Sequence, residues 1–216
     1  MKPVIVNESC FFPLIISSPE VYRDETYGFI IGKNNRRKIG DERVPVVSLE
    51  IAYPLQTAIR RHGESDIGNE KTFERFANSL KALGIDLMSG YGDSDMKLLG
   101  GFHSHPNPHG HTRITRGDIK HIAYLLGLVK ENGDYRENDC WLELIMHVKD
   151  KDYKNPARPN NSKRDYPRKI GNILRFGYDG YEITTAGYWL RVHDLDTDSV
   201  RVEEAVLYAH WHLMKK

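Results

Sequence analysis

The sequence predicts an α/β protein in which helices flank a central mixed sheet. Short apolar runs of strand length alternate along the chain with segments whose apolar residues recur at helical spacing. Hydrophobic residues make up 39% of the chain, which is enough to build a core. The length of 216 residues suits one domain. We therefore expect residues 1–216 to form a single domain with insertions.

The first third of the chain predicts two strands after a broken apolar start. Pro13 divides the short apolar pieces 4–6 and 14–17. Residues 27–32 form an apolar run that we expect to be a buried strand ending in a Gly-Lys-Asn-Asn turn. In residues 47–53, Val, Leu, Ile and Tyr alternate with smaller or polar residues, which is the period of a half-buried strand.

The middle of the chain alternates helix and strand patterns. Apolar residues at helical spacing, followed by Gly84, predict a helix over 69–83. A buried strand is expected over 96–102, a second helix over 115–129 and another strand over 141–148.

The last part of the chain contains a polar stretch between two ordered segments. Residues 149–169 hold eight Lys or Arg against three Asp, so we expect an exposed basic insertion. Residues 174–192 predict strands and turns around glycines. Residues 203–214 are expected to form a closing helix.

Charge and cysteine content exclude several classes of protein. With 31 Lys plus Arg against 30 Asp plus Glu, the formal net charge is +1, which argues against nucleic-acid or membrane-surface binding. Cys10 and Cys140 lie beside Phe11 and Trp141, so we expect reduced, buried thiols. The longest apolar stretch falls short of the roughly 20 residues that span a bilayer, and no secretory signal is evident. A cytoplasmic location is expected.

A histidine-rich segment predicts a metal site. The run Gly101-Phe-His103-Ser-His105-Pro106 follows a predicted strand. Residues two apart in a strand point to the same face, so His103 and His105 can present two imidazoles to one ion. A catalytic zinc site commonly has three protein ligands. Asp118, in the first turn of the next predicted helix, is the best candidate for the third.

Asp118 also has a purely structural interpretation. Thr115-x-x-Asp118 fits a capping box, in which both side chains bond free backbone N–H groups at a helix start. The sequence leaves both roles open.

The combined pattern resembles the JAMM (JAB/MPN-plus) family of zinc metallopeptidases. That family pairs an upstream glutamate with His-Ser/Thr-His-Pro and then Ser-x-x-Asp. The upstream part is similar to Glu25-Thr-Tyr-Gly-Phe-Ile-Ile-Gly32 here. The resemblance covers about residues 20–150, and it implies a single MPN-type, cytidine-deaminase-like domain. It also implies one zinc ion per chain, held by His103, His105 and Asp118.

The resemblance further implies the catalytic roles. Glu25 would be the general acid/base that activates a zinc-bound water and protonates the leaving amine. Thr115 stands where the family usually has Ser, and its hydroxyl would bond the developing oxyanion. The loop 106–114 has nine residues where the family usually has seven.

Other candidate residues have competing interpretations. Glu50, on the polar face of a predicted strand, is the rival for the base, but a solvated strand glutamate explains it better. His109 and His111 are expected to be exposed loop residues, with substrate contact or transient metal binding as the alternative.

The resemblance also suggests the reaction and the partner. Members of this family commonly hydrolyse the bond after the Gly-Gly tail of ubiquitin-like proteins, so we expect a zinc isopeptidase acting on such a modifier and its conjugates. Regions 63–95 and 149–169 would correspond to insertions that contact the modifier. The length resembles that of compact prokaryotic and phage members.

Two alternative functions compete with this expectation. A non-catalytic MPN scaffold that binds a partner is the main one, although such relatives typically lose metal ligands and the full set is present here. A zinc deaminase would need a Pro-Cys-x-x-Cys element, which the sequence lacks.

Overall fold

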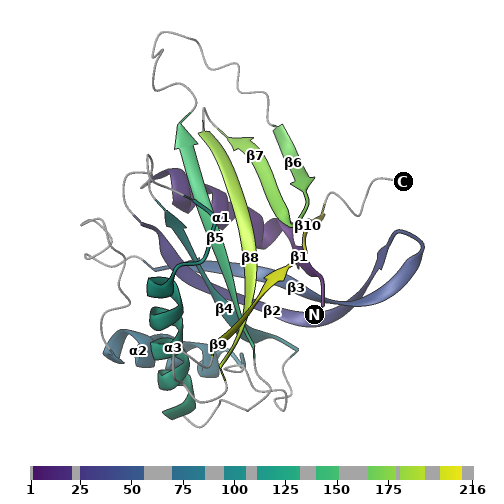
Figure 1. The fold of residues 1–216 in the computed structure, drawn as a ribbon. Coiled ribbons are helices and arrows are strands. Elements are labelled where there is room, and N and C mark those ends of the chain that lie inside the picture. Colours follow the sequence, from purple (N-terminus) through teal and green to yellow (C-terminus); the bar gives the residue numbers. More distant parts are fainter. Residues whose placement is uncertain are drawn as a thin grey trace.

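The computed structural model consists of one curved mixed sheet with helices on both faces (Figure 1). This confirms the predicted α/β class. The structure describes the following residues: 2–20, 25–55, 70–85, 95–105, 111–131, 140–150, 165–178, 181–192 and 200–210. Within these ranges, no helix is both long enough and apolar enough to cross a membrane.

Among the described residues, ten strands form the sheet, in the order β10-β1-β3-β2-β4-β5-β8-β7-β6, with β9 pairing the remaining part of β8. Pairing is parallel for β1 with β10, β1 with β3, and β4 with β5, and antiparallel elsewhere. The sheet curls until β10 contacts β6 and β7, where the Lys169 ammonium lies 3.5 Å from the centre of the Tyr208 ring. The strand bounds are β1 Val4–Val6, β2 Tyr27–Ile39, β3 Glu42–Pro54, β4 Lys97–His105, β5 Trp141–Asp150, β6 Asp165–Ile170, β7 Ile173–Tyr178, β8 Tyr181–Val192, β9 Val200–Ala205 and β10 Leu207–Ala209.

The three helices in the described part of the chain divide the core into two parts. Helix α1 (Glu8–Glu20) packs with one face of the sheet through Cys10, Phe11 and Leu14. Helices α2 (Glu70–Ala82) and α3 (Arg116–Glu131) pack with the other face. On that second face Phe29 of β2 stacks on Phe76 of α2, with ring centroids 4.2 Å apart. We refer to the second face, covered by α2 and α3, as the α2/α3 face.

The predicted helices over 69–83 and 115–129 are confirmed as α2 and α3 within one or two residues. Gly84 ends α2 with a φ of 70°, and the N–H of Ile85 donates to the carbonyl of Leu80. This positive φ is the left-handed conformation that favours glycine at a helix end. The predicted strands over 96–102 and 141–148 correspond to β4 and β5.

Several local expectations were wrong. Pro13 does not divide the N-terminal segment, because α1 runs through it. The missing hydrogen bond costs about 3 kcal/mol, which burial of the neighbouring apolar side chains offsets. Strand β2 does not end after Gly32 but continues to Ile39, because β3 pairs with its whole length and the chain reverses at Gly40, where φ is 62°. This β2–β3 arm extends away from the body of the protein (Figure 1).

The third error concerns β3, where burial does not alternate as the sequence suggests. Val47 and Leu49 are buried, whereas Ile51 and Tyr53 are exposed. Ile31 pairs with Ile51 but the next residue, Gly32, pairs with Leu49, so Glu50 is an extra residue in a bulge. A bulge moves the following side chains to the opposite face.

The fourth error concerns the C-terminal segment. Residues 203–205 and 207–209, part of the segment 203–214 expected to be helical, lie in β9 and β10, and residues 211–214 fall outside the described residues. Ala205, Leu207 and Ala209 are fully buried at every second position, which is the period of a strand. The basic segment 149–169 falls largely outside the described residues, but its end, expected to be a loop, forms part of β6. The region 63–95 is described only at 70–85 and 95.

Candidate metal centre

Three predicted ligands converge on the α2/α3 face. His103 and His105 stand at the end of β4, and Asp118 lies in the first turn of α3. One donor atom from each lies within 4.8 Å of the other two. The closest pair is the two histidine Nε2 atoms, 3.2 Å apart. The structure therefore brings together side chains that could hold a metal ion.

In both histidines, the hydrogen bond made by Nδ1 determines that Nε2 faces the cluster. Nδ1 of His105 lies 2.6 Å from the carbonyl oxygen of His111, and Nδ1 of His103 lies 2.8 Å from a carboxylate oxygen of Glu143. Both partners are acceptors, so both Nδ1 atoms carry a hydrogen. In the neutral rings, the lone pairs on Nε2 then face each other.

The spacing of the donors fits a shared ion. Two nitrogens bound to one tetrahedral zinc at about 2.0–2.1 Å each lie about 3.3 Å apart. Asp118 Oδ1 lies 3.3 Å from Nε2 of His103 and 3.9 Å from Nε2 of His105. Two imidazoles and one carboxylate are also the donor types that zinc accepts.

The capping box forms at the same place. The N–H of Thr115 donates to Asp118 Oδ2 at 2.6 Å, and the N–H of Asp118 donates to the Thr115 hydroxyl at 3.1 Å. The two interpretations of Asp118 are therefore compatible, because one carboxylate oxygen bonds the helix start and the other faces the histidines.

Charge within the cluster shifts the protonation of its members in the metal-free protein. Burial would lower the pKa of His103, but hydrogen bonds to Asp118 and Glu143 outweigh it and raise the pKa to about 10. Burial would raise the pKa of Asp118, but hydrogen bonds from His103 and His105 hold it well below its usual range. A proton on His103 therefore takes the place that a cation would occupy.

The backbone of Glu25 approaches the end of β4 because its neighbour Thr26 bonds to Ser104. The N–H of Thr26 donates to the Ser104 hydroxyl at 2.9 Å, and the N–H of Ser104 donates to the carbonyl of Thr26 at 2.9 Å. Tyr27 pairs with His103. Continuing this antiparallel register two residues beyond the start of β2 places the backbone of Glu25 opposite His105.

Glu50, the rival base, lies elsewhere. Its carbonyl accepts a hydrogen bond from the Ser9 hydroxyl of α1, and its charge contributes, after burial, to raising the pKa of Cys10. Cys10 is buried on the opposite face of the sheet from the histidines. Glu50 is therefore on the side of the sheet that carries α1.

Of the two loop histidines, the structure describes His111. Its side chain is exposed, as expected, and its ring lies edge-on to that of His105 with centroids 4.5 Å apart. His109 falls outside the described residues. Cys10 is buried as expected, whereas Cys140 is only partly buried, and neither forms a disulfide within the described residues.

Sequence reasoning missed three residues around the site. Glu143 and Trp141 lie in β5, and the Trp141 indole N–H donates to Glu143 at 2.6 Å. His147 pairs with His105 in the β4–β5 register, and its pKa is lowered by burial and by nearby charges led by Lys149. The available signal for Glu143 was a lone carboxylate between Leu142 and Leu144 in an apolar strand, which predicts a paired buried charge.

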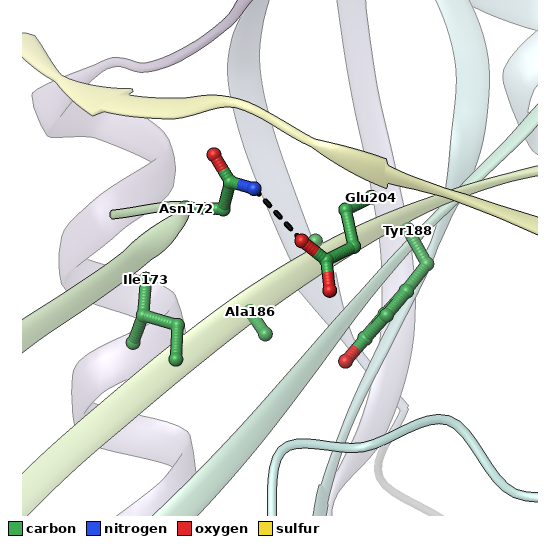
Figure 2. A pocket seen from close by; sticks show the side chains of 6 residues that line it. Asn172, Ile173, Ala186, Tyr188 and Glu204 are labelled. Atoms are coloured by element: carbon green, nitrogen blue, oxygen red, sulfur yellow. Dashed lines mark hydrogen bonds between the residues drawn. The ribbon is translucent and has the colours of Figure 1, made fainter. Parts of the chain in front are cut away.

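A separate pocket lies over β7, β8 and β9 (Figure 2). An amide hydrogen of Asn172 donates to Glu204 at 2.8 Å across it. None of the predicted ligands lines this pocket. Tyr188 does, and its hydroxyl donates to the carbonyl of Thr112 at 2.8 Å, which connects β8 to the segment between the histidines and α3. The lining residues are Asn172, Ile173, Ala186, Gly187, Tyr188 and Glu204.

Comparison with known proteins adds no functional information. No protein-family model matches the chain, and no curated protein matches it. The chain is similar to the solution structure of a Desulfitobacterium hafniense protein determined as a structural genomics target. The two are 16% identical over 99% of each chain, with a TM-score of 0.46. The assignment of function therefore depends on the site itself.

Proposed function

We propose that the protein is a zinc-dependent isopeptidase of the JAMM type, with an MPN-type domain, that cleaves the bond after the C-terminal tail of a ubiquitin-like modifier. The observation that carries this proposal is the convergence of His103, His105 and Asp118, with the two Nε2 atoms 3.2 Å apart. The same three residues are the ligands that the sequence resemblance implies. The backbone register, which continues to Glu25 opposite His105, is consistent with the same reaction.

Each residue has a defined task in this reaction. His103 and His105 would hold the ion through Nε2, and Asp118 through Oδ1. Bound zinc supplies a water of lowered pKa and polarises the scissile carbonyl. Glu25 accepts the proton of the attacking water and delivers it to the leaving amine, so that no covalent intermediate with the protein is needed.

The Thr115 hydroxyl can donate a hydrogen bond in addition to the one that it accepts at the start of α3. Its hydroxyl oxygen accepts the N–H of Asp118, which leaves the hydroxyl hydrogen available for donation. That hydrogen is the group that would bond the developing oxyanion, a contribution of about 2.7–4 kcal/mol in comparable sites.

The test uses the full chain loaded with one equivalent of zinc. A panel of ubiquitin-like proteins, each fused through its Gly-Gly tail to a reporter, is incubated with the protein with and without a chelator. We expect cleavage after the tail that the chelator abolishes. Glu25→Gln should retain zinc and lose cleavage by at least 100-fold, since general acid–base catalysis contributes about 10²–10⁴.

Glu50→Gln is the matched control, because it makes the same change on the other side of the sheet and should leave the rate unaltered. Unchanged cleavage by Glu25→Gln would contradict the assigned base. Absence of zinc binding, with retained binding of a modifier, would instead identify a non-catalytic scaffold.

A further inference from the structure

Glu143 has a buried carboxylate that contacts the imidazole of His103 on the side away from the other candidate ligands. Its side chain is completely inaccessible to solvent. Oε1 lies 2.8 Å from Nδ1 of His103, and Oε2 accepts the indole N–H of Trp141 at 2.6 Å. Burying a carboxylate is costly unless its oxygens are hydrogen-bonded. Each oxygen has a donor here, so the carboxylate is held in one orientation.

Gly101 provides the space for this contact. In the parallel register of β4 and β5, Gly101 pairs with Glu143, two residues before His103. A Cβ atom at position 101 would lie 3.0 Å from Oε2 of Glu143 and 2.7 Å from the Tyr27 hydroxyl oxygen. A side chain there would displace the carboxylate. The glycine therefore allows Glu143 to reach along the strand to His103.

We propose that Glu143 is a positioning residue that orients His103 for metal binding. By accepting the Nδ1–H, Glu143 fixes the tautomer in which Nε2 faces His105 and Asp118. Its negative charge also makes the imidazole a stronger ligand. His105 is held by a neutral carbonyl instead, that of His111, so the two histidines are oriented by different kinds of acceptor. This inference rests on the proposed metal-binding function.

The test compares the zinc affinity of three variants with that of the unmutated protein, by competition with a chelator of known affinity. Glu143→Gln should bind zinc 10–100-fold more weakly, which is the usual effect of losing such a partner. Trp141→Phe should weaken zinc binding less than Glu143→Gln does, because the charged carboxylate still accepts the Nδ1–H of His103.

The double variant W141F/E143Q distinguishes the loss of the Glu143 charge from the loss of an acceptor for the Trp141 indole N–H. Gln has a single acceptor oxygen, so in Glu143→Gln either His103 or Trp141 lacks its acceptor. If the loss came from the indole, removing the indole N–H would restore the affinity. We expect no restoration: the double variant should remain 10–100-fold weaker than Trp141→Phe. Restoration to the affinity of Trp141→Phe would overturn the role of the charge.

A measurement without substitution covers the case in which the variants do not fold. In the zinc-loaded protein labelled with ¹⁵N-histidine, long-range ¹H–¹⁵N spectra should show His103 with hydrogen on Nδ1 and the metal on Nε2. Coordination through Nδ1 would overturn the proposal. An unchanged zinc affinity in folded Glu143→Gln would overturn the inference alone. Failure of the unmutated protein to bind zinc would overturn both the inference and the proposed function.

Discussion

Asp118 and Thr115 form a reciprocal pair of hydrogen bonds that directs a carboxylate oxygen towards two histidines. Thr115 N–H donates to Oδ2 at 2.6 Å, and Oδ1 lies 3.3 Å from Nε2 of His103. The cap limits rotation of the carboxylate, so the helix start fixes the orientation of the candidate ligand. Local secondary structure and the site therefore depend on the same two residues.

Asp118→Asn should weaken zinc binding while preserving α3. The amide retains one oxygen that can accept the Thr115 N–H, but it removes the negative charge from the cluster. We expect the affinity for zinc to fall at least tenfold, equivalent to about 1.4 kcal/mol, in a chelator competition. Asp41→Asn, at the exposed turn of the β2–β3 arm, is the matched control. Equal affinities of the two variants would contradict the assignment of Asp118 as a ligand.

The stability of the metal-free protein should fall as pH rises from about 6.5 to about 10. The pKa of His103 is raised from 6.5 to about 10 in the folded state. Protonated His103 therefore makes its full contribution to the free energy of unfolding below pH 6.5. This contribution is lost as pH rises through the folded pKa, with a slope of up to about 1.4 kcal/mol per pH unit. Urea unfolding in the presence of a chelator measures it.

His103→Gln is the control for this pH dependence, because it removes the titrating group. Between pH 7 and pH 10, the free energy of unfolding should fall less steeply with pH in this variant. The difference in slope should be up to about 1.4 kcal/mol per pH unit, for the one proton that His103 no longer binds. Identical slopes in the variant and the unmutated protein would show that His103 is not held protonated by Asp118 and Glu143.

Ser104→Ala should destabilise the fold by about 1–3 kcal/mol. Its hydroxyl accepts the N–H of Thr26, a fully buried residue, and alanine would leave that donor unsatisfied. Ser79→Ala is matched to it, since the Ser79 hydroxyl bonds a carbonyl on the exposed side of α2. The control should change stability by less than about 0.5 kcal/mol. Equal free energies of unfolding would show that the Thr26–Ser104 bond has no structural role.

Two glycine-to-alanine substitutions should have opposite effects on thermal stability. At Gly100 a Cβ would lie 1.8 Å from the carbonyl oxygen of Leu142, so β4 and β5 would have to separate, at a cost of at least about 3 kcal/mol. At Gly127, inside α3, an added Cβ would meet no atom of the described residues within 4 Å apart from its chain neighbours and the backbone of the helix itself. Alanine there should stabilise the helix by about 0.5–1 kcal/mol. A stabilised Gly100→Ala would contradict the close strand contact.

Errors in the sequence prediction fall where pairing partners determine the structure. Helices α2 and α3 were predicted because helical periodicity and a glycine stop are local properties. The exposure of Ile51 and Tyr53 was not predicted, because the bulge at Glu50 arises from pairing with β2. The expected helix over 203–214 was wrong at residues 203–209 for a similar reason, since β9 and β10 gain their hydrogen bonds from β8 and β1.

The sequence by itself determined the donor set of the site. Two histidines separated by one residue share a face of any strand, and an aspartate three residues after a threonine lies in the first turn of a helix, because both rules follow from local backbone geometry. Only the tertiary structure decided which residues hydrogen-bond and orient those donors. Glu143 reaches His103 across 40 residues of sequence because β4 and β5 pair in parallel and Gly101 leaves room between them. Such a contact depends on which strands become neighbours, and that is decided by burial of the whole sheet.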